Sequence, residues 1–235
     1  MEEVFRNGTL EMSASPVSGL AGETAWGDLL TNRILAVAAI VLLVLSLLDF
    51  FRLIPHLAYS FDRSRGAAEL EHSVGIARTR NGFALILALP FCLLADRYAL
   101  LRPAFWSRIP ALWSAPAALG VLLLFLLVRS LCYAAFRPRR LGSEESATLK
   151  HQPYNHFILL TLLMLASAAA MTLFRAPDPL IRSVLRWETA VIFFFAIFRS
   201  GQFLDSQGLG FTTILYLCGL EILPAALLVA VVLFF

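Results

Sequence analysis

The stretch "ILAVAAIVLLVLSLL", residues 34–48, is aliphatic throughout apart from Ser46. The apolar run that contains it extends from Arg33 to Ile54, close to the roughly 20 residues that a helix needs to cross the hydrocarbon of a bilayer. It begins after a polar leader, too far along the chain for a cleaved signal peptide, so we expect it to remain in the protein. The run therefore predicts a transmembrane helix.

The whole composition agrees with this prediction. The 235 residues are 59% hydrophobic and 15% charged, and their mean hydropathy is +0.78, whereas soluble domains average about 45–50% apolar and about 25% charged residues. We therefore expect an all-α polytopic transmembrane helix bundle. The scattered arginines do not form the basic face of a nucleic-acid-binding protein, so the expected partners are the bilayer and other membrane proteins or further copies of this chain.

Six apolar runs are candidate spans, and we expect about six membrane crossings. They cover residues 33–54, 82–101, 115–136, 156–174, 181–199 and 211–235. The second run is weakened by Pro90 and by Asp96 and Arg97, and the fifth by Arg186 and Glu188, so full crossing by these two stays open. In domain terms, residues 1–32 are a polar leader that can hold an interfacial helix, and residues 33–235 form one membrane-embedded domain.

The connections between the runs differ in character. We expect a short surface helix within 55–81, an interfacial segment at 102–114 with Trp106 and Trp113 at headgroup level, a solvated loop at 137–153 and a glycine-rich turn at 200–210. Placing the first, third and fifth loops in the cytoplasm puts ten Arg and Lys residues inside and eight outside. This bias predicts that both termini of the multi-pass protein lie outside the cytoplasm.

Glu221 is the most unusual residue of the last run, because it lies near the middle of residues 211–235. Pro224 has no N–H, so the carbonyl of Leu220 loses its helical partner one turn from this acid. Tyr216 lies on the same broad face. One interpretation is a proton or cation relay or a ligand-recognition acid, and the other is a buried acid that fixes helix packing.

Three other charged residues lie in predicted spans. Arg129 either snorkels to the cytoplasmic face or meets an acid within the bundle, for which Glu221 is one conceivable partner. Glu188 and Arg199 share a helical face but lie roughly 16 Å apart along the axis, so each needs a separate partner. Interfacial ion pairs are the simpler interpretation for both.

A metal or cofactor site is not predicted. His151 and His156 are five residues apart at the mouth of the fourth run, which departs from the spacing of three or four that zinc ligands use on a helix. They are weak candidates for metal ligands. The alternative is that they are simply polar residues at the start of the fourth span. The three cysteines lie in different runs without a C-x-x-C motif, so they read as small buried hydrophobes. No nucleophile, phosphate-loop or prenyltransferase motif occurs in the sequence, and we assign no catalytic residue.

The segment "FTTILYLCGLEILPAALLV", residues 211–229, carries a resemblance. It resembles the closing helix of a family of bacterial multi-pass inner-membrane proteins that is catalogued as a domain of unknown function and reads roughly F-x-x-I-L-Y-L-C-x-x-E-I-L-P-L-L. The matching positions are Phe211, Ile214, Leu215, Tyr216, Leu217, Cys218, Glu221, Ile222, Leu223 and Pro224. The match ends at Ala225 and Ala226, where larger aliphatic residues are expected. The resemblance implies a membrane location and a helix bundle but no activity.

Three functions fit these patterns. The first is a non-catalytic component of an envelope membrane assembly, which suits short loops and the lack of a cofactor motif. The second is a small transporter or proton-coupled channel subunit centred on Glu221, with Arg129, Glu188 and Arg199 as counter-charges. The third is an integral membrane enzyme that acts on lipid through Glu221 or the two histidines. A polar cavity that reaches Glu221 would favour transport, and a lateral cleft with two titratable groups would favour the enzyme.

Overall fold

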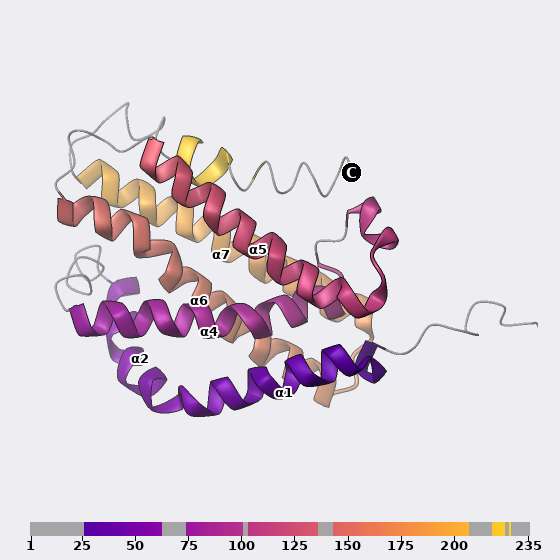
Figure 1. Ribbon diagram of the computed structural model, residues 1–235. Helices are drawn as coiled ribbons and strands as arrows, with labels where there is room; N and C mark the ends of the chain where they lie inside the picture. The colour runs from indigo at the N-terminus through magenta and orange to yellow at the C-terminus, as the bar shows by residue number, and fades with distance from the viewer. Residues whose placement is uncertain are drawn as a thin grey trace, which may run out of the picture.

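The protein is helical in every part that the structure describes (Figure 1), and no strand occurs there. The structure is a computed structural model and describes residues 26–62, 74–100, 103–135, 143–206, 218–223 and 226. The prediction of an all-α fold is confirmed for these residues. The α-helices are α1 Leu30–Leu45, α2 Leu47–Asp62, α4 Val74–Arg97, α5 Ala111–Ala135, α6 Ser143–Leu173 and α7 Asp178–Ser206. Three short elements accompany them: the 3₁₀ turns η1 Trp26–Asp28 and η2 Ala104–Arg108, and the π-helix η3 Cys218–Ile222.

Helix α4 lies at the centre of the bundle. It packs against α6, α5, α1 and α2. In Figure 1, α1 and α2 lie below α4, α5 and α7 lie above it, and α6 crosses behind it. Most of the buried side chains that hold it are apolar: Leu87 contributes to a cluster with Leu53 of α2 and Ile158 of α6. Because α4 is apolar around most of its circumference, it is buried on several sides at once.

Three helices are long and apolar enough to cross a membrane, namely the segments Gly75–Arg97, Ala111–Tyr133 and Leu149–Leu173. The broken pair Leu30–Leu45 and Leu47–Leu57 makes a fourth if it is one span. The described part of the chain thus has the helices of a membrane protein, with three to four candidate spans. Helix α7 falls short of the same criterion, and most of the sixth run lies outside the described residues.

The first apolar run is not one straight helix as predicted. It bends by 66° between α1 and α2. At the break, Ser46 is buried and its hydroxyl donates to the carbonyl of Leu43 at 3.1 Å, while its N–H still bonds Leu42 at 3.0 Å. A serine hydroxyl that bonds to the preceding turn competes with the helical ladder and bends the helix.

Two predicted loops are partly helical. Helix α6 begins at Ser143, so residues 143–153 are not a solvated loop, and α7 continues to Ser206 into the predicted glycine-rich turn. Pro153 lies inside α6, where it cannot donate to the carbonyl four residues earlier, that of Leu149. The hydroxyl of Tyr133 on α5 donates to this carbonyl at 3.2 Å. A tertiary contact thus supplies the hydrogen bond that the proline removes, and the helix continues.

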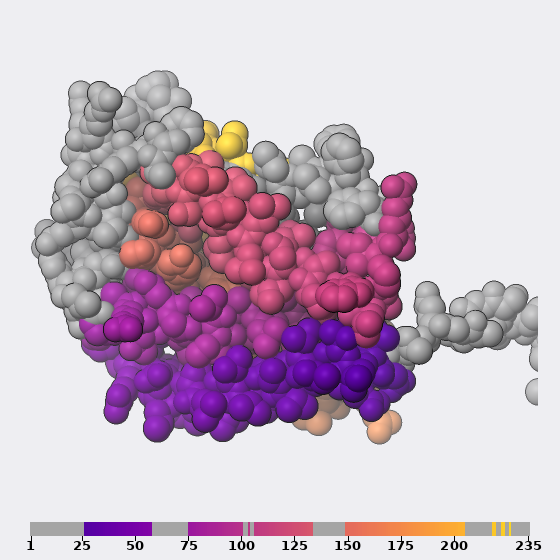
Figure 2. Space-filling model, in the orientation of Figure 1, coloured from indigo at the N-terminus to yellow at the C-terminus, as the bar shows by residue number. Residues whose placement is uncertain are grey.

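The outer surface of the bundle is largely apolar. Figure 2 shows the face formed by α1, α4 and α5, with part of α6 visible between α4 and α5. Exposed side chains on α1 and α5 are mainly aliphatic, as expected of helix faces that meet lipid acyl chains. They include Ile34, Val37, Ile40, Val41, Val44, Leu45, Val121, Leu123, Leu124, Leu127 and Leu131.

Candidate functional site

Four side chains form a hydrogen-bonded chain where α4 ends and α5 begins. The indole nitrogen of Trp26 donates to Asp96 Oδ2 at 2.7 Å, and the hydroxyl of Ser114 donates to Asp96 Oδ1. The indole nitrogen of Trp106 donates to Ser114 Oγ at 2.8 Å. Asp96 and Ser114 are buried, with 3% and 5% of their surface exposed. The chain joins four segments of the protein and compensates the cost of burying a carboxylate.

The network includes one of the two tryptophans of the predicted interfacial segment at residues 102–114. Trp106 is 8% exposed, and its N–H donates to Ser114 within the protein. Trp113 points outward and is 61% exposed, as expected of an interfacial tryptophan. One of the two tryptophans therefore belongs to the interior and the other to the surface.

Arg97 closes the same end of α4. Its guanidinium carbon lies 5.4 Å from the ring centre of Trp26 and 5.8 Å from that of Tyr98. Arg97 is exposed, whereas Tyr98 is buried. Aromatic faces attract a guanidinium and hold it in a defined place while its N–H groups stay accessible.

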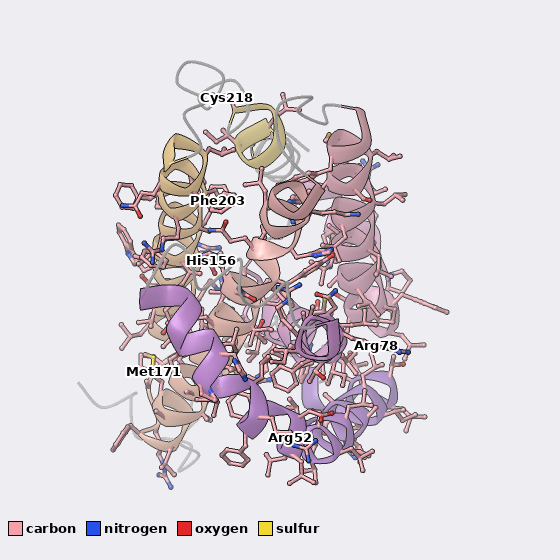
Figure 3. All side chains as sticks on the ribbon, turned by 90° about the vertical axis from the view of Figure 1, so that its left-hand side faces the viewer. Arg52, Arg78, His156, Met171, Phe203 and Cys218 are labelled. Carbon is pink, nitrogen blue, oxygen red and sulfur yellow. The ribbon has the colours of Figure 1, made fainter. Side chains whose placement is uncertain are left out.

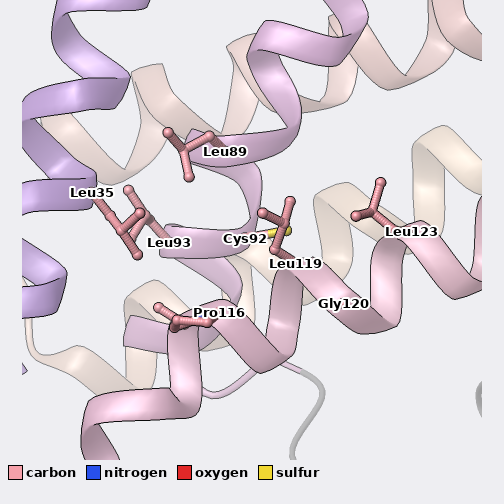
Figure 4. Close-up of a pocket in the computed structure, with 9 residues that line it drawn as sticks. Leu35, Leu89, Cys92, Leu93, Pro116, Leu119, Gly120 and Leu123 are labelled. Atoms are coloured by element: carbon pink, nitrogen blue, oxygen red, sulfur yellow. The ribbon is translucent and has the colours of Figure 1, made fainter.

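An apolar groove of about 230 Å³ lies between α1, α4 and α5 (Figure 4). Its lining is aliphatic apart from the thiol of Cys92, which is buried. The lining residues are Leu35, Leu89, Cys92, Leu93, Ala115, Pro116, Leu119, Gly120 and Leu123. Gly120 and Leu123 are exposed, so the groove opens on the outer side of α5.

The other end of the bundle carries buried polar groups on α6. Gln152, Asn155 and His156 share one helical face and are 4%, 2% and 5% exposed. His156 Nδ1 pairs with the carbonyl of Gln152 at 3.1 Å, and its ring lies against Phe195 of α7 inside the bundle (Figure 3). Gln152 Oε1 and Asn155 Oδ1 have no hydrogen-bond partner within the part of the chain that the structure describes. Buried acceptors of this kind are rare in native proteins.

Arg129, predicted to snorkel or to meet an acid, is 7% exposed and lies inside the bundle. Its guanidinium lies over the ring of Tyr133, 5.1 Å from the ring centre, and donates to the Tyr133 hydroxyl at 3.4 Å. The short helix η3 packs against α5, the helix that carries Arg129. The side chain of Glu221 lies outside what the structure describes, so its pairing with Arg129 remains a prediction.

Glu188 and Arg199 do not meet each other, as the spacing predicted. Glu188 accepts a hydrogen bond of 3.0 Å from the hydroxyl of Ser167 on α6, and Arg199 donates to Gln202 at 3.0 Å. A salt bridge among the described residues joins Arg33 and Asp28 and includes neither Glu188 nor Arg199. Glu188 is therefore a link between α6 and α7 rather than part of an ion pair with Arg182 or Arg186.

The structure describes only some of the remaining predicted site residues. Tyr216 and Pro224 lie outside the described residues, as does the side chain of Glu221. His151 stacks on Tyr154 at 5.8 Å. Across the described ranges, no three His, Cys, Asp or Glu side chains are grouped as a metal ion would require.

Comparison with known proteins identified no relative of this chain. No family model matches the chain, and neither a curated protein nor a solved structure matches it. The resemblance of residues 211–229 to a family of bacterial membrane proteins therefore stays a prediction.

Sequence reasoning missed the Trp26–Asp96–Ser114–Trp106 network. Its hydrogen-bonded partners are as much as 70 positions apart, and no local spacing connects them. The available signal was a carboxylate at the end of an apolar run with tryptophans on both sides in the sequence. Since a buried carboxylate needs donors, an indole and a hydroxyl were candidates, but only the packing of α1, α4 and α5 selects them.

Proposed function

We propose that this protein is a non-catalytic subunit of a membrane assembly in the bacterial inner membrane. In this proposal the chain crosses the bilayer about six times, with both termini outside the cytoplasm. The observation that carries the proposal is a stripe on the outer face of α7. Trp187, Val191, Phe194 and Phe198 recur at helical spacing and are 71%, 59%, 70% and 63% exposed.

The composition of this stripe differs from that of the other outer faces. Helices α1 and α5 expose mainly Leu, Ile and Val, whereas α7 exposes large aromatic side chains. Aromatic residues are enriched at protein–protein interfaces and supply many of their strongest contacts. This difference in exposed side chains supports the proposal that a partner protein contacts the outer face of α7, whereas lipid contacts the outer faces of α1 and α5.

The charged residues of α7 support the same assignment. This helix has 29 residues, enough to cross a bilayer, yet it contains Arg182, Arg186, Glu188 and Arg199. A charged side chain in the hydrocarbon costs about 2.5–3.5 kcal/mol on insertion scales. A partner protein on the outer face of α7 would shield these charged side chains from the hydrocarbon. Assembly with a partner would therefore lower the free-energy cost of α7 as a membrane span.

The buried polar contacts support a structural role over catalysis. Asp96, Glu188 and Arg129 each bond to a side chain of the same protein, and the groove is lined by one titratable residue, Cys92. An enzyme that acts on lipid would need two such titratable groups in its cleft.

Transport centred on Glu221 is the alternative function. The substitution Glu221→Gln examines whether the charge of this residue is needed, because glutamine keeps the size of the side chain but cannot ionise.

The experiment that tests the proposal is site-specific photo-crosslinking in cells. A photoreactive residue replaces Phe194 on α7 or, as a matched control, Leu124 on α5, which is 59% exposed on an aliphatic face. We expect a protein adduct at position 194 and none at 124, also in a Glu221→Gln background. The mass of the adduct distinguishes a second copy of this chain from a different protein. Lipid adducts alone at both positions would contradict the proposal.

A further inference from the structure

We propose that the groove between α1, α4 and α5 binds an acyl chain of an anionic phospholipid, whose phosphate is held by Arg97. On α5 the groove begins at Ala115, next to the hydrogen-bonded Ser114, and reaches Leu123. These eight residue steps correspond to about 12 Å along the helix axis. The groove therefore starts at the polar end of the helix and runs toward the middle of a candidate span.

The volume and lining of the groove fit an acyl chain. An apolar cavity of about 150 Å³ stays dry and binds apolar ligands, and this groove of about 230 Å³ is larger. Its opening at Gly120 and Leu123 lies on α5, whose outer face is aliphatic and which has the length and hydropathy of a span. The molecules that meet this opening in a bilayer are lipids.

Arg97 lies at the end of the groove where a headgroup would lie. Trp26 packs against the cluster that includes the lining residues Leu93 and Ala115, and the guanidinium of Arg97 lies over the Trp26 ring. Leu93 and Arg97 are one turn apart on the same face of α4. The N–H groups of Arg97 donate to no residue in the described ranges and are exposed, and a guanidinium binds phosphate through two parallel hydrogen bonds.

The charges at this end favour an anionic headgroup. The carboxylate of Asp96 is turned inward and accepts hydrogen bonds from Trp26 and Ser114, and Asp28 is paired with Arg33 at 2.8 Å. Both acids are thus engaged by groups other than Arg97. A basic residue near the membrane surface attracts anionic lipids by about 1 kcal/mol, so the phosphate and net charge of the lipid both contribute to retention.

Native mass spectrometry of the full-length protein in detergent micelles tests the proposal, with phosphatidylglycerol or phosphatidylcholine added. Gly120→Leu adds a large side chain at a residue that lines the groove, and nothing lies within 4 Å of the position that its Cβ would take. The matched control is Gly82→Leu on α4, also exposed and open. Arg97→Gln removes the headgroup contact, and Arg108→Gln is its control at an exposed arginine of η2. Circular dichroism confirms that each variant is folded.

We expect the wild type to retain one phosphatidylglycerol at least about fivefold more than phosphatidylcholine. Gly120→Leu and Arg97→Gln should each lower this retention by about fivefold, whereas the two controls should match the wild type. Equal retention of both lipids by the wild type would overturn the proposal, as would unchanged retention in Gly120→Leu. Displacement of the lipid by inorganic phosphate alone would also overturn it, because the site would then bind a free anion.

Discussion

The indole N–H of Trp26 donates a 2.7 Å hydrogen bond to the carboxylate of Asp96, 70 residues away in the sequence. This bond fastens the segment before α1 to the end of the central helix α4. Asp96 is buried, so its carboxylate has lost its hydration, and the bond from Trp26 offsets part of the free-energy cost of that loss. The relationship leads directly to the first prediction.

Trp26→Phe should lower the free energy of unfolding by about 1–3 kcal/mol, because the buried carboxylate loses a donor. Thermal unfolding in detergent, followed by circular dichroism, measures the change. Trp113→Phe is the matched control, since Trp113 is 61% exposed and lies outside the network. Equal effects of the two substitutions would mean that the Trp26–Asp96 bond contributes little.

Tyr133→Phe should destabilise the protein by about 1–2 kcal/mol, because the Leu149 carbonyl loses the donor that replaces the missing N–H of Pro153. The decisive measurement is a double-mutant cycle with Pro153→Ala, which restores an N–H at that position of α6. In the Pro153→Ala background the cost of Tyr133→Phe should be smaller. Additive effects of the two substitutions would contradict this account.

Ser46→Ala should straighten the junction of α1 and α2, because the 66° bend coincides with the hydroxyl bond to Leu43. Spin labels at the exposed residues Val37 and Ile54 report the change as a longer distance in pulsed electron paramagnetic resonance. Ser46→Thr keeps the hydroxyl and should preserve the wild-type distance. An unchanged distance in Ser46→Ala would show that packing against α4 causes the bend.

Cysteine labelling tests the six-span topology. In a protein lacking Cys92, Cys132 and Cys218, single cysteines replace Lys150 and Gln202, both exposed at the same end of the bundle. A membrane-impermeant reagent should label both from the cytoplasmic side, because the intervening segment would cross the bilayer twice. Labelling of the two positions from opposite sides would break the six-span proposal.

That the described residues form helices, several of them long and apolar enough to cross a membrane, could be predicted from sequence, because both features depend on long apolar runs. The run 34–48 predicted helical structure, which the chain forms as α1 and the start of α2. Helices α4, α5 and α6 end within a few residues of the predicted ends of the second, third and fourth runs. The start of α6 could not be predicted, since residues 143–153 are polar and contain Pro153. The segment is nevertheless helical, because the Tyr133 hydroxyl on α5 donates the hydrogen bond to the Leu149 carbonyl that Pro153 cannot donate.

The candidate site divides in the same way. Arg129 and Glu188 were identified from sequence because charge is unusual in an apolar run, yet their contacts with Tyr133 and Ser167 were not foreseen. The network around Asp96 and the groove beside it were missed, because the network joins four segments and the groove is assembled from three helices. Neither has a local sequence pattern.

Hydropathy along the chain thus determined where helices form and that they suit a bilayer, because the transfer of apolar side chains from water depends on composition and length. Tertiary structure alone decided which polar groups from different helices bond to one another and where the groove opens. Those features depend on the mutual approach of side chains such as Trp26 and Asp96, which only the packing of the helices brings within hydrogen-bonding distance.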